Sequence, residues 1–256
     1  MMSTQGIDDP PDDTDYEVHN RNAEETVAAD HELERYEDRT EDTTFSPENW
    51  EAIYPGKYKT CWKGVLLIKD PFTIVILQQL LWDIKPRTII EFGANTGGSA
   101  MYMADMMKMY GYNTHVYSMD IDLELLAPLA REKRDDLTFI EGDCNKVEKA
   151  FPADFLKSLP HPWLVLEDAH VNTFGVLDHL DPFTASGDYI LVEDTDPVAP
   201  SNTNEIASGW GKQKLNNLTK FMKKHTERYR VDKRYTDFFG YNGSINVNGF
   251  LKRVEE

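Results

Sequence analysis

The 256-residue sequence predicts an α/β fold in which helices cover both faces of a mostly parallel sheet. Three observations lead to this fold. Short apolar runs typical of strands alternate with segments that repeat apolar residues at helical spacing. A glycine-rich turn at 93–98 joins the first of these strands to a helix. Acidic residues follow the expected strand ends, which is the edge where parallel sheets bind ligands.

Charge divides the chain into two expected parts. Residues 1–44 hold 15 acids and three arginines, a net charge of −12 out of −18 for the whole chain. This segment has few large apolar residues, so we expect a disordered leader or one loose helix near 23–39. Residues 45–256 should form the folded domain. The acidic balance argues against nucleic acid as a substrate, because phosphate binding needs a basic face.

The elements of the domain follow from local pattern. In 45–67, Pro47 favours a helix start, and Trp62-Lys63-Gly64 favours a turn. A helix is expected at 71–82, with Pro71 in its first turn. Strands are expected at 88–91, 116–120, 137–140, 163–166 and 189–192, and helices at 99–110, 123–134, 147–158 with a break near Pro152, 171–183 and 215–225. Two last strands at 229–235 and 244–252, turning at Asn242-Gly243, would complete a seven-stranded sheet with a C-terminal antiparallel hairpin.

The segment TIIEFGANTGGSA at 88–100 is the most informative stretch of the chain. Its strand, glycine turn and helix start bring backbone close to a ligand and point helix amides at it. The spacing resembles the first motif of S-adenosylmethionine-dependent methyltransferases, E/D-x-G-x-x-x-G-G. It is not the dinucleotide fingerprint, because Asn95 replaces the second glycine. The alternative is a turn that only packs the helix on the strand. The resemblance implies these cofactor-binding residues: Glu91, Gly93, Asn95, Gly97, Gly98 and Ser99.

The acids at the other strand ends suggest further ligand contacts. Asp120, followed by Ile121, falls where a second strand would meet a ribose. A carboxylate there can accept hydrogen bonds from both ribose hydroxyls. Asp143 is placed either to hold an adenine amino group or to cap the next helix. The pairs Glu167-Asp168 and Glu193-Asp194 offer hard oxygen ligands suited to Mg²⁺, unless these side chains fan outward into water.

His170 follows the first of these pairs by two residues, over the same sheet edge. Histidine exchanges a proton near neutral pH, so His170 is the candidate general base. Its alternative role is to support a carboxylate that binds the metal.

Four segments together resemble the cephalosporin hydroxylase/rhamnosyl O-methyltransferase family, over 50–254. They are TCWKG at 60–64 with KDP at 69–71, IIEFGANTGGSA, LVLEDAHVNTFGVL with GDYILVEDTDP, and NGFLKR at 248–253. The resemblance implies a Rossmann-like class I methyltransferase fold, the cofactor S-adenosylmethionine and a Mg²⁺ site. By this resemblance the metal ligands are Glu167, Glu193 and Asp194, and Glu167 shares the catalytic role with His170.

The sequence departs from the family pattern at three positions. Aspartate is commoner than Glu167 at the first ligand, so either Glu167 or Asp168 could reach the metal. Phe92 and Asn95 replace a threonine and a histidine of the glycine turn, which alters contacts to the cofactor.

We therefore expect a Mg²⁺-assisted O-methyltransferase that acts on a hydroxyl of a sugar or small secondary metabolite. The acceptor pocket would use Tyr54, Tyr58, Trp62 and the loop after Asp194. The alternatives are a non-catalytic S-adenosylmethionine-binding partner protein and an oxidoreductase or hydroxylase component. A cofactor titration against NAD separates the last class from the first.

The remaining expectations concern the setting of the protein. No run of the sequence approaches the ~18 apolar residues that would cross a bilayer. Cys61 and Cys144 lie far apart and form no C-x-x-C pair, which favours a reducing compartment, and we expect a cytoplasmic protein. Its partner should be a small-molecule hydroxyl acceptor, neither nucleic acid nor membrane, and the chain should form a homo-oligomer.

Overall fold

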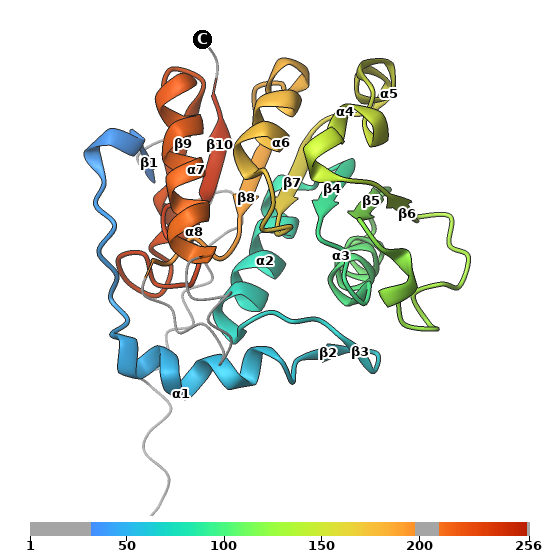
Figure 1. Ribbon diagram of the computed structural model, residues 1–256, viewed down its shortest axis with the longest axis horizontal. Helices are drawn as coiled ribbons and strands as arrows, with labels where there is room; N and C mark the ends of the chain where they lie inside the picture. Colours follow the sequence, from blue (N-terminus) through green and yellow to red (C-terminus); the bar gives the residue numbers. More distant parts are fainter. Residues whose placement is uncertain (1–31, 198–209, 255–256) are drawn as a thin grey trace, which may run out of the picture. The chain divides into compact units, whose positions relative to one another are not determined.

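An eight-stranded sheet forms the centre of the protein in the computed structural model, which describes residues 32–197 and 210–254 (Figure 1). The sheet order is β1-β9-β10-β8-β7-β4-β5-β6. The strands are β1 (Leu33–Glu34), β4 (Thr88–Phe92), β5 (His115–Asp120), β6 (Leu137–Glu141), β7 (Trp163–Glu167), β8 (Tyr189–Val192), β9 (Tyr229–Asp232) and β10 (Phe250–Arg253). Strands β4 to β8 pair in parallel, and β10 pairs antiparallel with β8 and β9. The predicted mostly parallel sheet is confirmed, with one strand more than expected.

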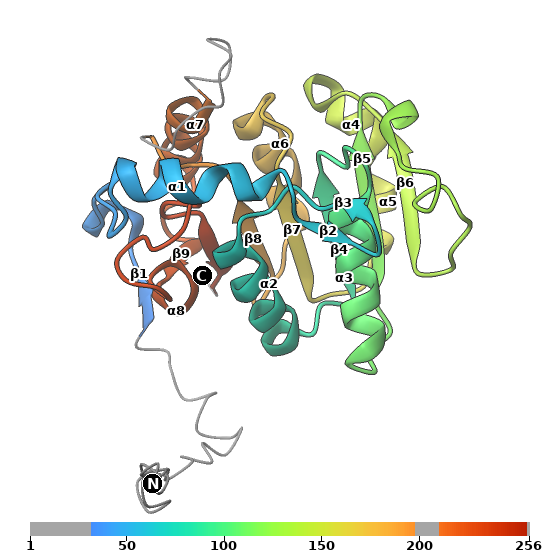
Figure 2. The same ribbon diagram turned by 90° about the horizontal axis from the view of Figure 1, so that it is seen from below.

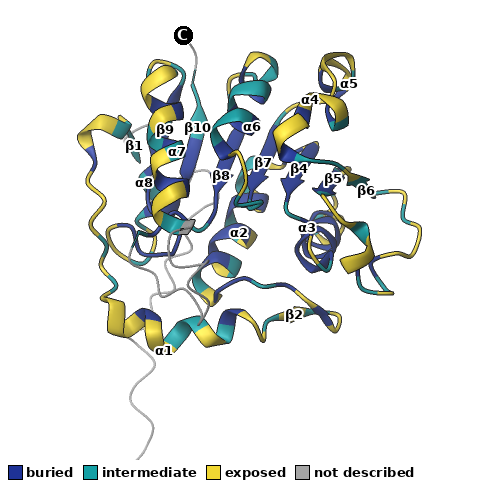
Figure 3. Ribbon diagram, viewed as in Figure 1, coloured by how far each residue is buried: buried dark blue, intermediate teal, exposed yellow. Residues whose placement is uncertain are grey.

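Helices cover both faces of this sheet (Figure 2). One face carries α2 (Pro71–Ile84) and α3 (Gly98–Met109), and the other carries α4 (Val147–Ala150), α5 (Ala153–Ser158), α6 (Thr173–Leu180) and α7 (Trp210–Lys224). Successive strand residues serve opposite faces: Ile89 packs in the cluster with α2 and α3, and Ile90 packs in the cluster with α6 and α7. The central strands β4, β7 and β8 are fully buried between the two layers, as Figure 3 shows. No described helix is long and apolar enough to span a bilayer.

The segment before the parallel strands crosses their carboxyl ends. Helix α1 (Pro47–Lys57) begins with a capping box between Ser46 and Asn49, as its Pro47 start predicted. A small hairpin follows, formed by β2 (Cys61–Trp62) and β3 (Val65–Leu66). Its turn residues Lys63 and Gly64 both have left-handed backbone, with φ of 51° and 82°. This segment therefore lies across the edge of the sheet where ligands bind (Figures 1 and 2).

The folded unit begins earlier than the expected boundary at residue 45. It starts at Glu32, and β1 pairs with β9. A short 3₁₀ helix, η4 (Tyr36–Asp38), follows, and the guanidinium of Arg39 is buried against Asp237 and Asn248 at 2.6 Å each. Residues 32–44 therefore belong to the fold, and residues 1–31 of the expected leader lie outside the described residues.

The predicted helix at 123–134 is wrong. Only a 3₁₀ turn forms there, η5 (Leu123–Leu125), capped by Asp122. Pro128 disfavours helical backbone at the preceding Ala127, whose N–H instead bonds to the carbonyl of Thr96 at 3.0 Å. Among the described residues, 3₁₀ turns also form at η6 (Cys144–Lys146) and η7 (Asp181–Phe183). The predicted break at Pro152 is confirmed between α4 and α5.

The predicted C-terminal antiparallel pair is present, but its hairpin turn is not. β9 ends at Asp232 because that side chain caps a short helix, α8 (Lys233–Thr236). β10 begins only at Phe250, so residues 244–249 form a loop rather than a strand. Buried side chains of Asn242, Asn246 and Asn248 hold this loop through hydrogen bonds.

Candidate active site

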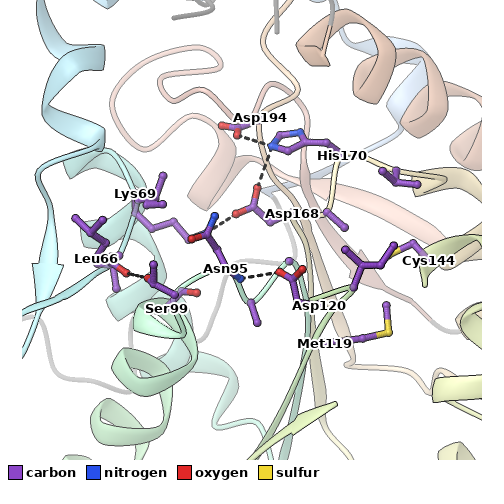
Figure 4. Close-up of a pocket in the computed structure, with 18 of the residues that line it drawn as sticks. Leu66, Lys69, Asn95, Ser99, Met119, Asp120, Cys144, Asp168, His170 and Asp194 are labelled. Atoms are coloured by element: carbon purple, nitrogen blue, oxygen red, sulfur yellow. Dashed lines mark hydrogen bonds and ion pairs between the residues drawn. The ribbon is translucent and has the colours of Figure 1, made fainter. Parts of the chain in front are cut away.

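A cavity of about 440 Å³ opens at the carboxyl ends of the parallel strands. Its lining comes from α1, the segment around β3, the glycine turn after β4 and the loops after β5, β6, β7 and β8 (Figure 4). The sequence-predicted residues that line it are Gly93, Asn95, Ser99, Asp120, Ile121, Asp143, His170 and Asp194. The other predicted site residues, Glu91, Gly97, Gly98, Glu167 and Glu193, do not line it.

The glycine turn is needed for two kinds of close approach. Gly93 has a φ of 101°, and a Cβ there would lie 2.8 Å from the carbonyl oxygen of Asp168. A Cβ on Gly97 would lie 2.7 Å from Ala130 Cβ, and one on Gly98 would collide with the carbonyl of Leu66. The missing side chains at Gly97 and Gly98 therefore allow neighbouring segments of the protein to pack closely. The sequence had led us to expect that these two glycines contact the cofactor.

Glu91 lies beneath the cavity. It is fully buried and accepts hydrogen bonds from the hydroxyls of Ser99 and Ser118. Burial raises its pKa, which Lys69 opposes. Ser99 does line the cavity. The expected cofactor contact at Glu91 is thus replaced by a supporting role, in which its carboxylate fixes the first turn of α3.

The loops after β5 and β6 place two carboxylates at the cavity. Asp120 Oδ2 accepts the N–H of Asn95 at 2.7 Å, and Asn95 has left-handed backbone with a φ of 46°. Ile121, next to Asp120, is 69% exposed. Asp143 caps η6 by accepting the N–H of Asn145 at 2.8 Å while it also lines the cavity. The capping alternative for Asp143 is therefore observed, and contact with an adenine amino group stays a prediction.

The loops after β7 and β8 bring three ligand-type side chains together. Atoms of Asp168, His170 and Asp194 all lie within 4.8 Å of one another, and all three residues line the cavity (Figure 4). His170 Nε2 lies 3.4 Å from Asp194 Oδ2 and 3.8 Å from Asp168 Oδ1. The two carboxylates are donors that fit a hard divalent cation, and the imidazole beside them can accept a proton.

The expected ligand set differs from this cluster at two of its three members. Glu167 is fully buried behind the cavity, where its carboxylate lies 3.1 Å from Lys214 Nζ. Glu193 is also buried, 2.8 Å from Lys69 Nζ, and burial raises its pKa. Of the open pair Glu167 and Asp168, Asp168 is the one that reaches the cavity.

Three buried lysines, which sequence reasoning missed, surround these acids. Lys57 bonds Asp194, Lys69 bridges Asp168 and Glu193, and Lys214 bonds Glu167. Burial opposes ionisation of Asp168, yet the attraction of Lys69 and its neighbours outweighs this and lowers its pKa. Lys69 stands in the KDP segment at 69–71, which could have marked it. Lys57 and Lys214 carried no comparable signal.

The backbone at this cluster is held in an unfavourable conformation. His170 and Asp194 have φ values of 55° and 56°, a region that residues with a Cβ adopt at a cost. Asn246, fully buried in the C-terminal loop, accepts the N–H of Asp194 at 2.9 Å and so holds it there. Its position in the sequence gave no hint of this contact.

On the acceptor side, two of the expected aromatic residues line the cavity. Tyr54 and Tyr58 project from the end of α1, with their ring centroids 5.8 Å apart. Trp62 does not line it; its ring packs edge-on to Tyr102 and its N–H donates to Asp105 at 2.7 Å. Of the expected loop after Asp194, residues 198–209 lie outside the described residues.

The sheet and its strand-end cavity define a Rossmann-like class I methyltransferase fold. The family model Rhamnosyl O-methyltransferase/CmcI matches residues 56–254, and the chain belongs to that family. It is 27% identical over 214 residues to the Rhamnosyl O-methyltransferase of Mycobacterium leprae (strain TN), covering 80% of this chain and 90% of that protein. It is also 27% identical over 200 residues to the Rhamnosyl O-methyltransferase of Mycobacterium tuberculosis (strain ATCC 25618 / H37Rv), covering 76% and 78%.

Solved structures of CmcI agree with this assignment. The Mg-SAM form superposes with a TM-score of 0.62 at 26% identity, covering 77% of this chain and 78% of that one. The SAH form gives a TM-score of 0.62 at 25% identity, covering 85% and 95%. The predicted family and fold class are confirmed.

Proposed function

We propose that this protein transfers the methyl group of S-adenosylmethionine to a hydroxyl of a sugar or small metabolite, assisted by Mg²⁺. One observation carries the proposal: the Asp120–Asn95 edge and the Asp168–His170–Asp194 cluster line the same cavity of about 440 Å³. A methyl donor at the first edge would face an acceptor at the second. The names of the relatives support this reading, since they include Rhamnosyl O-methyltransferase and the Mg-SAM form of CmcI.

The cofactor half of the cavity suits a nucleoside. The carboxylate of Asp120 already accepts the N–H of Asn95, and it has further capacity to accept ribose hydroxyls. Met119, Ile121 and Cys144 supply apolar surface beside Asp143 for a planar base. Because Gly93 has no Cβ, the donor can approach the loop after β7 closely.

The acceptor half supplies proton and metal chemistry. Asp168 and Asp194 would hold the cation, which, when bound, lowers the pKa of an acceptor hydroxyl as a Lewis acid. Burial lowers the pKa of His170, so its imidazole is neutral at pH 7 and able to accept the hydroxyl proton. The fixed walls align acceptor oxygen and donor methyl, and such positioning supplies a large part of the acceleration.

The rim of the cavity favours an acceptor with both apolar and hydroxyl surfaces. Tyr58, Leu66, Ile121 and Val171 are exposed apolar side chains that also line the cavity. The Tyr54 and Tyr58 rings can stack on the apolar face of a sugar ring, whose neighbouring hydroxyls would then point toward Asp194. We therefore favour a glycosidic acceptor over a charged hydroxy acid.

The test is transfer of a labelled methyl group from S-adenosylmethionine to a panel of rhamnosides, other glycosides, catechols and hydroxy acids, with and without Mg²⁺. We expect methylated glycoside and loss of turnover in Asp168→Asn with Asp194→Asn. Cofactor affinity of that variant should stay within several-fold, because Asp120 is untouched. Binding of S-adenosylmethionine with no turnover on any acceptor would favour the non-catalytic partner, and preferential binding of NAD would favour an oxidoreductase.

The cellular setting is also a proposal. Within the described residues Cys61 and Cys144 are unpaired thiols, one exposed and one buried, which suits a reducing cytoplasm. A homo-oligomer stays a prediction, which light scattering during size-exclusion chromatography checks.

A further inference from the structure

Lys57 occupies both oxygens of a proposed metal ligand. It is the last residue of α1, and its Nζ lies 2.7 Å from each carboxylate oxygen of Asp194. Lys57 is 4% exposed and lines the cavity, with the ring centroid of Tyr54 5.5 Å from its ammonium group. The ammonium group of Lys57 and the carboxylate of Asp194 form a largely buried ion pair.

Asp194 cannot bind this ammonium group through both carboxylate oxygens and bind a divalent cation at the same time. Mg²⁺ binds carboxylate oxygens at ~2.0–2.1 Å and therefore needs at least one oxygen that Lys57 now holds. An unmoved ammonium group would also face a cation of the same sign at short range in a buried site. Asp168 differs, because Lys69 bonds only its Oδ2, and its Oδ1 faces His170. Competition for both oxygens of one carboxylate is thus found at Asp194, where Lys57 bonds the two.

We propose that Lys57 is an internal competitor for the cation, which has to displace the Lys57 ammonium group from Asp194 in order to bind. This inference rests on the proposed function, since it presumes a divalent cation at Asp168 and Asp194. Lys57 thereby weakens cation affinity and neutralises Asp194 while the site is empty.

The first test compares Mn²⁺ affinity by calorimetry and electron paramagnetic resonance in the full chain. Lys57→Met should bind Mn²⁺ at least about tenfold more tightly than the wild type, because the competing charge is gone. Lys57→Arg keeps the charge and should show no gain. Lys224→Met is the matched control: Lys224 pairs with Asp178 on the outer helices, 53% exposed, and its loss should leave affinity unchanged.

The outcomes separate this inference from the proposed function. Wild-type binding with no gain in Lys57→Met overturns the competition and leaves the metal site standing. Absence of binding in both proteins overturns both proposals. Binding by Lys57→Met alone supports the competition in its strongest form.

A second test uses the unmutated protein, in case Lys57→Met does not fold. Reductive methylation mapped by mass spectrometry reports how accessible each lysine is. Saturating Mn²⁺ should increase modification of Lys57 several-fold, because the displaced ammonium group leaves its carboxylate, while Lys224 should react equally with and without Mn²⁺. Unchanged modification of Lys57 at saturating Mn²⁺ contradicts the proposal.

Discussion

Asn246 offers a way to disturb Asp194 without touching the cavity. Replacing Asn246 by alanine removes the acceptor of the Asp194 N–H at 2.9 Å and the donor to Thr73 Oγ1 at 3.1 Å. An unpaired buried N–H costs ~1–3 kcal/mol, and the second hydrogen bond contributes ~0.5–1.5 kcal/mol. Asp194 would also be free to leave its left-handed backbone, at a φ of 56°, whose cost of ~1–2 kcal/mol the bond now helps to offset. The two lost interactions together cost ~1.5–4.5 kcal/mol and the relief of backbone strain lowers this, so we expect a loss of roughly 1–3 kcal/mol in the free energy of unfolding.

Stability alone does not show that Asn246 positions the site, so a matched control is needed. Asn248 is a buried asparagine of the same loop that bonds Arg39 and Thr40 but does not contact Asp194. Urea unfolding should show comparable losses for Asn246→Ala and Asn248→Ala. Only Asn246→Ala should also lower kcat and Mn²⁺ affinity, by about tenfold or more, because only Asp194 moves. Equal effects of the two variants on kcat and Mn²⁺ affinity would refute the reasoning.

Asp120→Ala should weaken S-adenosylmethionine binding by ~10–100-fold in calorimetry, because charge-assisted hydrogen bonds contribute ~1.5–3 kcal/mol. An unchanged affinity would show that Asp120 is not part of the cofactor site. Gly98→Ala should lower stability by ~1–3 kcal/mol, since its Cβ would lie 2.6 Å from the carbonyl carbon of Leu66. Gly56→Ala in α1 is the control: its Cβ would have nothing within 4 Å, so thermal melts should show a neutral or stabilising effect. Burial raises the pKa of Asp232 from 3.8 to about 6, so its contribution to stability is complete below pH 3.8 and is lost as the pH rises through 6. Relative to Asp232→Asn, the wild type should lose roughly 3 kcal/mol of unfolding free energy between pH 4 and 8. Parallel pH profiles of the two proteins would contradict this.

The sequence predicted the edge of the sheet better than the direction of individual side chains. Acids after strands pointed to the correct edge, and Asp120 and Asp194 line the cavity there. Glu91 and Glu167 do not line the cavity, because both are residues of the strands β4 and β7 rather than of the loops that follow them. Since successive strand residues point to opposite sides, a shift of one residue exchanges a cavity position for a buried one.

The partners of these acids could not be predicted because they come from distant segments. Lys57, Lys69 and Lys214 stand in α1, before α2 and in α7, and Asn246 stands in a loop that the alternating pattern misread as a strand. Only tertiary packing brings them to the loops after β7 and β8. The early start at Glu32 was hidden for a related reason: the acidic composition around it indicates disorder, whereas a pairing with β9 and the buried Arg39 decide the outcome.

The proposed function requires that the methyl donor and the divalent cation bind in one cavity. Nuclear magnetic resonance of S-adenosylmethionine labelled with ¹³C in its methyl group, bound to the full chain without acceptor, measures this directly when Mn²⁺ is added. We expect strong broadening of the bound methyl signal by Mn²⁺, which is reversed by excess Mg²⁺ and absent in Asp168→Asn with Asp194→Asn. A bound methyl signal that stays sharp while Mn²⁺ binds the wild-type protein would place the two ligands apart and rule out a shared cavity.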